Sequence, residues 1–197
     1  LYADDPSISE IRITGELYVT LAVNKYGDYV ALEEKLQQHK FCPNPESTSI
    51  VRHIYNGIPV DIIPNGAEIA VSGTNKWYAY WNNDVRYVQV NSQKIRIYSP
   101  AVFIATKFEA FKNRGNDYRT SHDIEDVLYI IENSSDIAME VSRAHNDVRT
   151  FLSEQFTLLL SQQSSEEILS ANIDRAIIAE TLPILKERIQ AIILSSG

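Results

Sequence analysis

The apolar pattern of this chain changes its period once, close to Pro100, and that change constrains the fold more than any other feature. Before Pro100, short apolar runs separated by turn residues have the pattern of strands. After Pro100, apolar residues recur at helical spacing as far as Ile193. Because strands come first and helices follow, the sequence predicts an α+β fold. We divide it into residues 1–99 and a helical C-terminal part, residues 100–197.

The same patterns predict individual elements. A helix over about residues 28–38 should turn Val30, Leu32 and Leu36 toward the sheet. Asn56-Gly57 between two apolar runs is the strongest short signal for a β-hairpin, and Asn91-Ser92 marks a second hairpin. Pro100 suits a first helical turn, and Thr120 or Ser121 can cap the next helix. The other expected segments are a strand or strand pair at 8–23, a connection at 41–46, strands at 49–55 and 58–63, an aromatic helix at 74–83, and strands at 85–90 and 94–98.

Composition excludes some classes of protein. The net charge of −8 over 197 residues argues against a broad basic surface for nucleic acid, although a local basic cleft stays open. The single cysteine, Cys42, cannot form an internal disulfide, and no apolar run approaches the length of a membrane span. We therefore expect a cytoplasmic protein without membrane association, built as one domain plus an extension. The chain opens on Leu1, so we expect that a preceding segment was cut away.

Two acids interrupt strands that are otherwise apolar. Glu16 lies in RITGELYV, residues 12–19, and Tyr18 occupies the position where a second acid would point the same way. Asp61 lies in IPVDIIP, residues 58–64. A buried carboxylate requires a cation, a metal or a hydrogen-bond donor. The alternative for Asp61 is a strand-end residue that makes a turn before Pro64.

The helical part contains charged residues on apolar stripes. Lys107 is surrounded at helical spacing by apolar residues, namely Phe103, Ile104, Ala110 and Phe111. It is either functional or a long side chain that reaches solvent from the core edge. Asp123 and Asp126 are three residues apart and share a helix face with apolar neighbours. The alternative for Asp123 is a first-turn carboxylate that complements the helix dipole.

Together these residues resemble a known family. The run ATKFEAFKNRGNDYRTSHDIEDV, residues 105–127, is similar to a segment of the AbiEii-like nucleotidyltransferases, which belong to the DNA polymerase β-type superfamily. Upstream features occur in the same order as in that family. They are LY-x-x-D-P at the start, Arg12-x-Thr14-x-Glu16-x-Tyr18, Gly-Ile-Pro-Val-Asp at 57–61, and Asn75-x-Trp77-Tyr78. The resemblance covers about residues 1 to 160.

The resemblance implies a nucleotidyltransferase-like mixed sheet with flanking helices, followed by helices packed on that core. It implies transfer of a nucleotidyl group from a nucleoside triphosphate to a hydroxyl acceptor, RNA or protein, with Mg²⁺ or Mn²⁺ neutralising the phosphates. Some members are toxins, for which a cognate antitoxin would be a partner. The catalytic and metal-binding carboxylates would be Glu16 and Asp61. The residues beside the nucleotide would be Arg12, Thr14, Lys107, Asp123 and Asp126, with Lys107 meeting phosphate oxygens.

Two departures from the family pattern bear on activity. The Gly-rich turn that holds the triphosphate should precede Leu1 and is absent from the sequence. Tyr18 replaces an acid, and a neutral phenol offers no anionic oxygen to a metal. The second hypothesis is therefore a catalytically impaired member of the fold that binds a nucleotide or a partner, and the third is a purely structural protein. A zinc site receives little support, because the histidines lack metal-ligand spacing: His39, His53, His122 and His145. A hydrolase site receives little support, because the sequence has no Ser-His-Asp order and no nucleophile elbow.

Overall fold

The structure is a computed structural model that describes residues 2–4, 17–23, 25–47, 49–64, 75–82, 84–114, 117–171, 173 and 175–195. Within these residues the chain is α+β, as predicted. It divides into two compact units. The sheet unit is Ile11–Ala79, and the helical unit combines Leu1–Glu10 with Tyr80–Gly197. The division predicted between residues 99 and 100 stays a prediction about domains.

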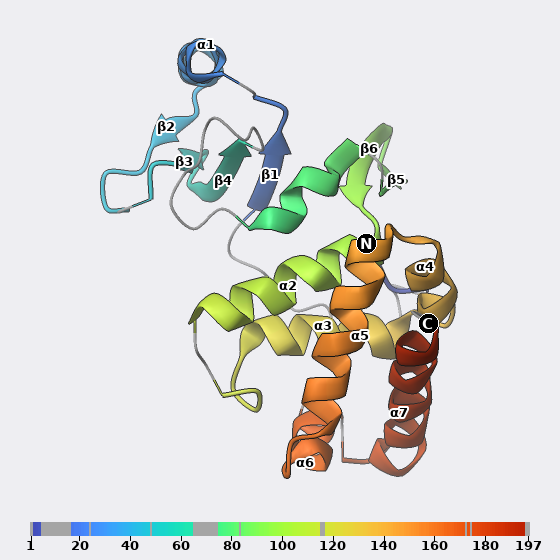
Figure 1. The fold of residues 1–197 in the computed structure, drawn as a ribbon. Coiled ribbons are helices and arrows are strands. Elements are labelled where there is room, and N and C mark those ends of the chain that lie inside the picture. Colours follow the sequence, from blue (N-terminus) through green and yellow to red (C-terminus); the bar gives the residue numbers. More distant parts are fainter. Residues whose placement is uncertain are drawn as a thin grey trace. The chain divides into compact units, whose positions relative to one another are not determined.

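The sheet unit contains a four-stranded mixed sheet with strand order β1-β4-β3-β2 (Figure 1). Strand β1, Leu17–Leu21, runs parallel to β4, Ile58–Pro64, while β3, Arg52–Tyr55, is antiparallel to β4. Pairing β1 with a strand so distant in sequence requires a crossover, and helix α1, Tyr26–Gln38, lies within it.

The predicted hairpin at Asn56-Gly57 is confirmed. Asn56 has φ 50° and Gly57 has φ 82°, the positive values that a two-residue hairpin turn demands. The turn fixes the register of β3 against β4, with Tyr55 opposite Ile58. Counting back from the turn places Arg52 opposite Asp61.

One face of the sheet packs against α1. Leu36 is buried with Val60 and Ile62, and Leu32 packs against them. The prediction that Val30 also faces the sheet is wrong, because its side chain is 43% exposed. Residues two apart on a helix lie on nearly opposite sides, so Leu32 and Leu36 can share a buried face that excludes Val30.

Two other expectations about this part of the chain need adjustment. The expected connection at 41–46 contains a short strand, β2, Cys42–Pro43, which pairs with β3. The aromatic segment expected to be helical forms the 3₁₀ helix η1, Lys76–Asn82. Asn75 accepts the backbone N–H of Trp77 through its side-chain oxygen, at 3.1 Å, which fixes the start of that helix.

The second predicted hairpin lies in the helical unit and is confirmed. Strands β5, Val85–Val90, and β6, Gln93–Tyr98, pair around Asn91, whose φ is 54°. The helices that follow are α2 Pro100–Arg114, α3 His122–Asn133, α4 Ile137–Arg143, α5 Asn146–Leu160, α6 Ser165–Ser170 and α7 Ile178–Leu194. Pro100 opens α2 as expected. Ser121 holds the N-cap position of α3, but its side chain makes no capping hydrogen bond.

The helices share a continuous apolar core. Helix α2 packs on α3 and α5, and α7 packs on α3, α4 and α5. Within the core the rings of Phe108 and Phe156 meet edge to face, with centroids 5.0 Å apart. No helix in the described part of the chain is both long enough and apolar enough to cross a membrane.

The first residues of the chain attach to the helical unit. The Tyr2 hydroxyl donates to the carbonyl oxygen of Tyr98 at 3.0 Å. Asp4 accepts from the backbone N–H and the hydroxyl of Ser135, at 2.8 and 2.7 Å. Burial raises the pKa of the Tyr2 phenol, and the facing Arg86 opposes that rise. In sequence, the sheet unit is thus an insertion between two parts of the helical unit.

Candidate functional site

Lys107 lies on α2 and directs its amino group at two carboxylates of α3. Its Nζ lies 2.6 Å from Asp126 Oδ2 and 3.5 Å from Asp123 Oδ1. The centroid of the Phe103 ring, one turn earlier on α2, lies 5.4 Å from the same nitrogen. Lys107 therefore contacts the two other described residues that the resemblance assigns to nucleotide binding.

Asp123 is the most buried of these charged groups, with 4% of its side chain exposed. Its Oδ2 also accepts a hydrogen bond from Nη1 of Arg114 at 2.6 Å. Lys107 and Arg114 are seven residues apart, about two turns, and so reach α3 from the same face of α2. We call Lys107, Arg114, Asp123 and Asp126 the α2–α3 charge cluster. It contains two cations and two carboxylates.

The members of the cluster differ in exposure. Lys107 and Asp126 have side chains that are 21% and 19% exposed, whereas Asp123 is enclosed. Asp123 is held by Arg114 as well as by Lys107.

Asp61 lies on β4 and is paired within the sheet unit. Nε and Nη2 of Arg52 on β3 donate to its two oxygens at 2.7 and 2.8 Å. The side chain of Asp61 is 10% exposed and that of Arg52 27%. The cation that a buried carboxylate requires is therefore supplied by the neighbouring strand, and Asp61 does not make a turn at a strand end.

Tyr18 on β1 lies directly beside Asp61 on β4 in the parallel register. Partners in register point to the same face of a sheet, so Tyr18, Asp61 and Arg52 form one row across three strands. Tyr18 is 51% exposed. The other predicted residues of this region, Arg12, Thr14 and Glu16, lie outside the described residues, so their roles stay predictions.

The described residues do not by themselves make a magnesium site. Among them no three histidine, cysteine or acidic side chains are arranged to hold a metal ion. Of the two predicted ligands only Asp61 is described, and both of its oxygens already accept from Arg52. The predicted Mg²⁺ or Mn²⁺ stays a prediction.

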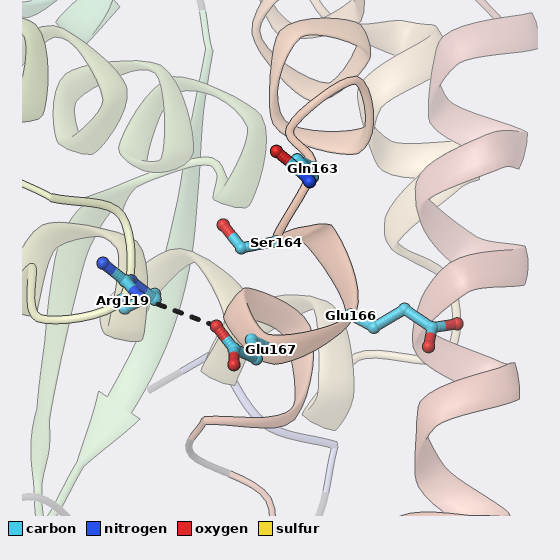
Figure 2. A pocket seen from close by; sticks show the side chains of 5 residues that line it. All are labelled: Arg119, Gln163, Ser164, Glu166 and Glu167. Atoms are coloured by element: carbon cyan, nitrogen blue, oxygen red, sulfur yellow. Dashed lines mark ion pairs between the residues drawn. The ribbon is translucent and has the colours of Figure 1, made fainter.

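A surface hollow of about 550 Å³ lies elsewhere in the helical unit, between the α2–α3 connection and the start of α6 (Figure 2). It is lined by Arg119, Gln163, Ser164, Glu166 and Glu167. Its charges are already paired: Arg119 contacts Glu167 at 3.6 Å, and Glu166 contacts Lys186. Figure 2 shows Glu166 pointing away from Arg119. Because no predicted site residue lines the hollow and its charges have partners, we do not take it as the functional site.

Sequence reasoning missed the cations that hold the two buried acids. Arg52 was readable in principle, because the Asn56-Gly57 turn places residue 52 opposite residue 61. The contact of Arg114 with Asp123 could not be predicted, because no local sequence rule tells which residues of two packed helices meet. A partly buried contact between β3 and α1 was also missed. In it, Nε2 of His53 lies 3.1 Å from Oε2 of Glu33.

The Glu33 carboxylate also affects the pKa of Tyr29 on the same helix. Burial, and then a hydrogen bond to Glu33, raise the pKa of Tyr29 to about 12. The ring of His53 is almost fully enclosed, and its Nδ1 lies 3.0 Å from the carbonyl oxygen of Val51. His53 faces α1, on the opposite side of the sheet from Asp61, and its partner Glu33 lies on α1 together with Tyr29. We assign them to the attachment of the helix.

Comparison with known proteins gave no match to a family model, a curated protein or a solved structure. The resemblance to the AbiEii-like proteins therefore depends on the quoted residues alone.

Proposed function

We propose that this chain is a nucleotidyltransferase-fold protein of the AbiEii-like kind that binds a nucleoside triphosphate at the α2–α3 charge cluster. The reaction of that class moves a nucleotidyl group from the triphosphate to a hydroxyl of an RNA or protein acceptor, and some members serve as toxins countered by an antitoxin. The observation that carries the proposal is the contact of Lys107 with both Asp123 and Asp126. Those residues belong to the longest stretch of resemblance.

Lys107 is the group suited to a phosphate. It is a compact cation with several donors, and its nearest partner, Asp126, is itself partly exposed. Nucleotide binding would exchange this ion pair for one with a phosphate oxygen. Asp123 then acts as a positioning residue, because it is the most enclosed carboxylate of the cluster and contacts both Lys107 and Arg114.

The second candidate function, nucleotide binding without transfer, is supported by the row Tyr18, Asp61 and Arg52. A phenol stands where an acid is expected, and a guanidinium engages both oxygens of the remaining described acid. In-line transfer needs charge stabilisation on both the attacking and the leaving oxygen. With Glu16 and Asp61 as the predicted ligands and no third acid, the site can help to position a triphosphate but supplies less of that stabilisation.

The test is transfer of radiolabelled nucleotide to bulk RNA and protein, with and without magnesium, alongside a binding measurement. Magnesium-dependent transfer that Lys107→Ala abolishes supports the first function. Binding without transfer supports the second. Replacing Tyr18 by Asp, in a chain that carries an upstream Gly-rich turn, should then raise transfer in the presence of magnesium. The absence of nucleotide binding by the unmodified protein contradicts both functions.

A further inference from the structure

Arg114 is the most exposed member of the α2–α3 charge cluster. It lies in the last turn of α2, and 56% of its side chain is exposed, against 21% for Lys107 and 19% for Asp126. One hydrogen bond joins it to the cluster, from its Nη1 to Oδ2 of Asp123 at 2.6 Å. A guanidinium carries five N–H donors, so this bond uses only a small part of its donor capacity.

Two other arginines of the molecule engage their carboxylates differently. Arg52 donates through Nε and Nη2 to the two oxygens of Asp61. Arg119 donates through the same two nitrogens to the oxygens of Asp117. In both pairs the carboxylate occupies the flat edge of the guanidinium that Nε and Nη2 form. The contact of Arg114 with Asp123 uses Nη1 instead, and that flat edge is the one that suits a phosphate.

Asp123 holds the cations of Arg114 and Lys107 close to each other. Its Oδ1 lies 3.5 Å from Nζ of Lys107, while its Oδ2 accepts from Nη1 of Arg114. With 4% of its side chain exposed, Asp123 is fixed by the packing of α3 on α2. Both nitrogens thus contact oxygens of one carboxyl group, although their residues are two helical turns apart. Adjacent phosphates of one chain also carry their charges close together, so one polyphosphate can contact both cations.

We propose that Arg114 is a second phosphate-binding residue of this site. Lys107 holds one phosphate of the nucleotide, and the flat edge of Arg114 holds the next phosphate outward from the nucleoside. The inference rests on the proposed function, because it takes the α2–α3 charge cluster as the nucleotide site. It narrows the class of ligand to nucleoside di- and triphosphates, since a monophosphate has no second phosphate for Arg114.

The carboxylates of the cluster sharpen this preference. A single phosphate beside Lys107 also meets the negative charge of Asp126, whose Oδ2 lies 2.6 Å from the lysine nitrogen. A second phosphate at Arg114 adds attraction from a cation whose own carboxylate, Asp123, is enclosed. The affinity should therefore rise steeply between a nucleoside monophosphate and the corresponding triphosphate.

The test measures, by calorimetry on the full chain with magnesium, the affinity for the monophosphates and triphosphates of the four ribonucleosides. The unsubstituted protein should prefer a triphosphate to its monophosphate by about tenfold or more. Arg114→Ala should weaken triphosphate binding about tenfold and change monophosphate binding about twofold or less. Arg114→Lys, which keeps the charge without the flat edge, should recover only part of the loss. Arg119→Ala is the matched control, because Arg119 is 51% exposed and already bonded to Asp117, and should change neither affinity.

Circular dichroism checks that each variant is folded. The inference is overturned if Arg114→Ala binds the triphosphate as tightly as the unsubstituted protein, or if it weakens both ligands equally, which would make Arg114 a structural residue. Equal affinity of the unsubstituted protein for a monophosphate and its triphosphate overturns it as well. In each of these cases a nucleotide still binds, so the proposed function stands. The absence of any nucleotide binding by the unsubstituted protein contradicts the proposed function itself, and this inference with it.

Discussion

Among the residues that the structure describes, two acids are buried, Asp61 in the sheet unit and Asp123 in the helical unit, and they are neutralised in different ways. Asp61 has one cation, Arg52, which engages both of its oxygens. Asp123 shares two cations, Lys107 and Arg114, and its neighbour Asp126 competes for one of them. The first arrangement is a bidentate pair, and the second is a network in which two cations share two carboxylates.

The difference follows from the elements that carry the residues. A hairpin register fixes one residue opposite another, so the cross-strand pair Arg52 and Asp61 is set by the turn. Two packed helices bring together residues at several positions along their axes. One carboxylate of α3 can therefore contact two cations of α2 that are two turns apart. A cation with more than one possible partner suits a ligand site, which is why we propose nucleotide binding at the helices.

The largest effect should come from breaking the bidentate pair of Arg52 and Asp61. Arg52→Met leaves Asp61 buried without its guanidinium and should cost about 3 kcal/mol, near the lower end for a broken buried pair because Arg52 is 27% exposed. Hydrogen exchange of the peptide spanning residues 49–64 measures this loss within the sheet unit. Adding Asp61→Asn should recover much of it. A loss below about 0.5 kcal/mol would show that the pair is not needed to compensate Asp61.

A smaller effect is expected in the network. Arg114→Ala should cost about 1 kcal/mol, because Lys107 still faces Asp123 and Arg114 is 56% exposed. Adding Lys107→Ala removes both cations, and the loss should then approach that of Arg52→Met. Strictly additive costs of the two substitutions, measured by hydrogen exchange of α3, would contradict the shared arrangement.

The smallest effect concerns pH and the N-terminal residues. Hydrogen bonds from the backbone N–H and then the hydroxyl of Ser135 lower the pKa of Asp4 below its ordinary 3.8. Because the folded state holds this proton less tightly than the unfolded state, the contribution to stability is present above about pH 4 and is lost as the pH falls through the folded pKa. Ser135→Ala should therefore cost at most about 1 kcal/mol near neutral pH, and less in acid. A cost that does not depend on pH would contradict this account.

The sequence predicted local features better than tertiary ones. Both hairpins were predicted because their turn residues encode the conformation, and Pro100 marked the start of α2. Val30 was misplaced because a short helix with several apolar residues allows more than one buried face. The ion pair between Lys107 and Asp126 joins separate helices, so the periodicity of apolar residues within one helix could not have predicted it. Only the resemblance brought those residues together, and their role in nucleotide binding stays a prediction.

The most direct test of the central claim is the affinity for a magnesium nucleoside triphosphate, measured by calorimetry on the unsubstituted chain, Lys107→Ala and Lys112→Ala. Lys112 is the matched control, since it lies on the same helix and its side chain is 48% exposed. We predict that Lys107→Ala weakens binding by roughly 1.5 to 3 kcal/mol, the range for charge-assisted bonds, and that Lys112→Ala has no effect. Equal affinity for all three proteins, with a lower melting temperature for Lys107→Ala, would contradict the claim and assign Lys107 to the structure of the helix pair.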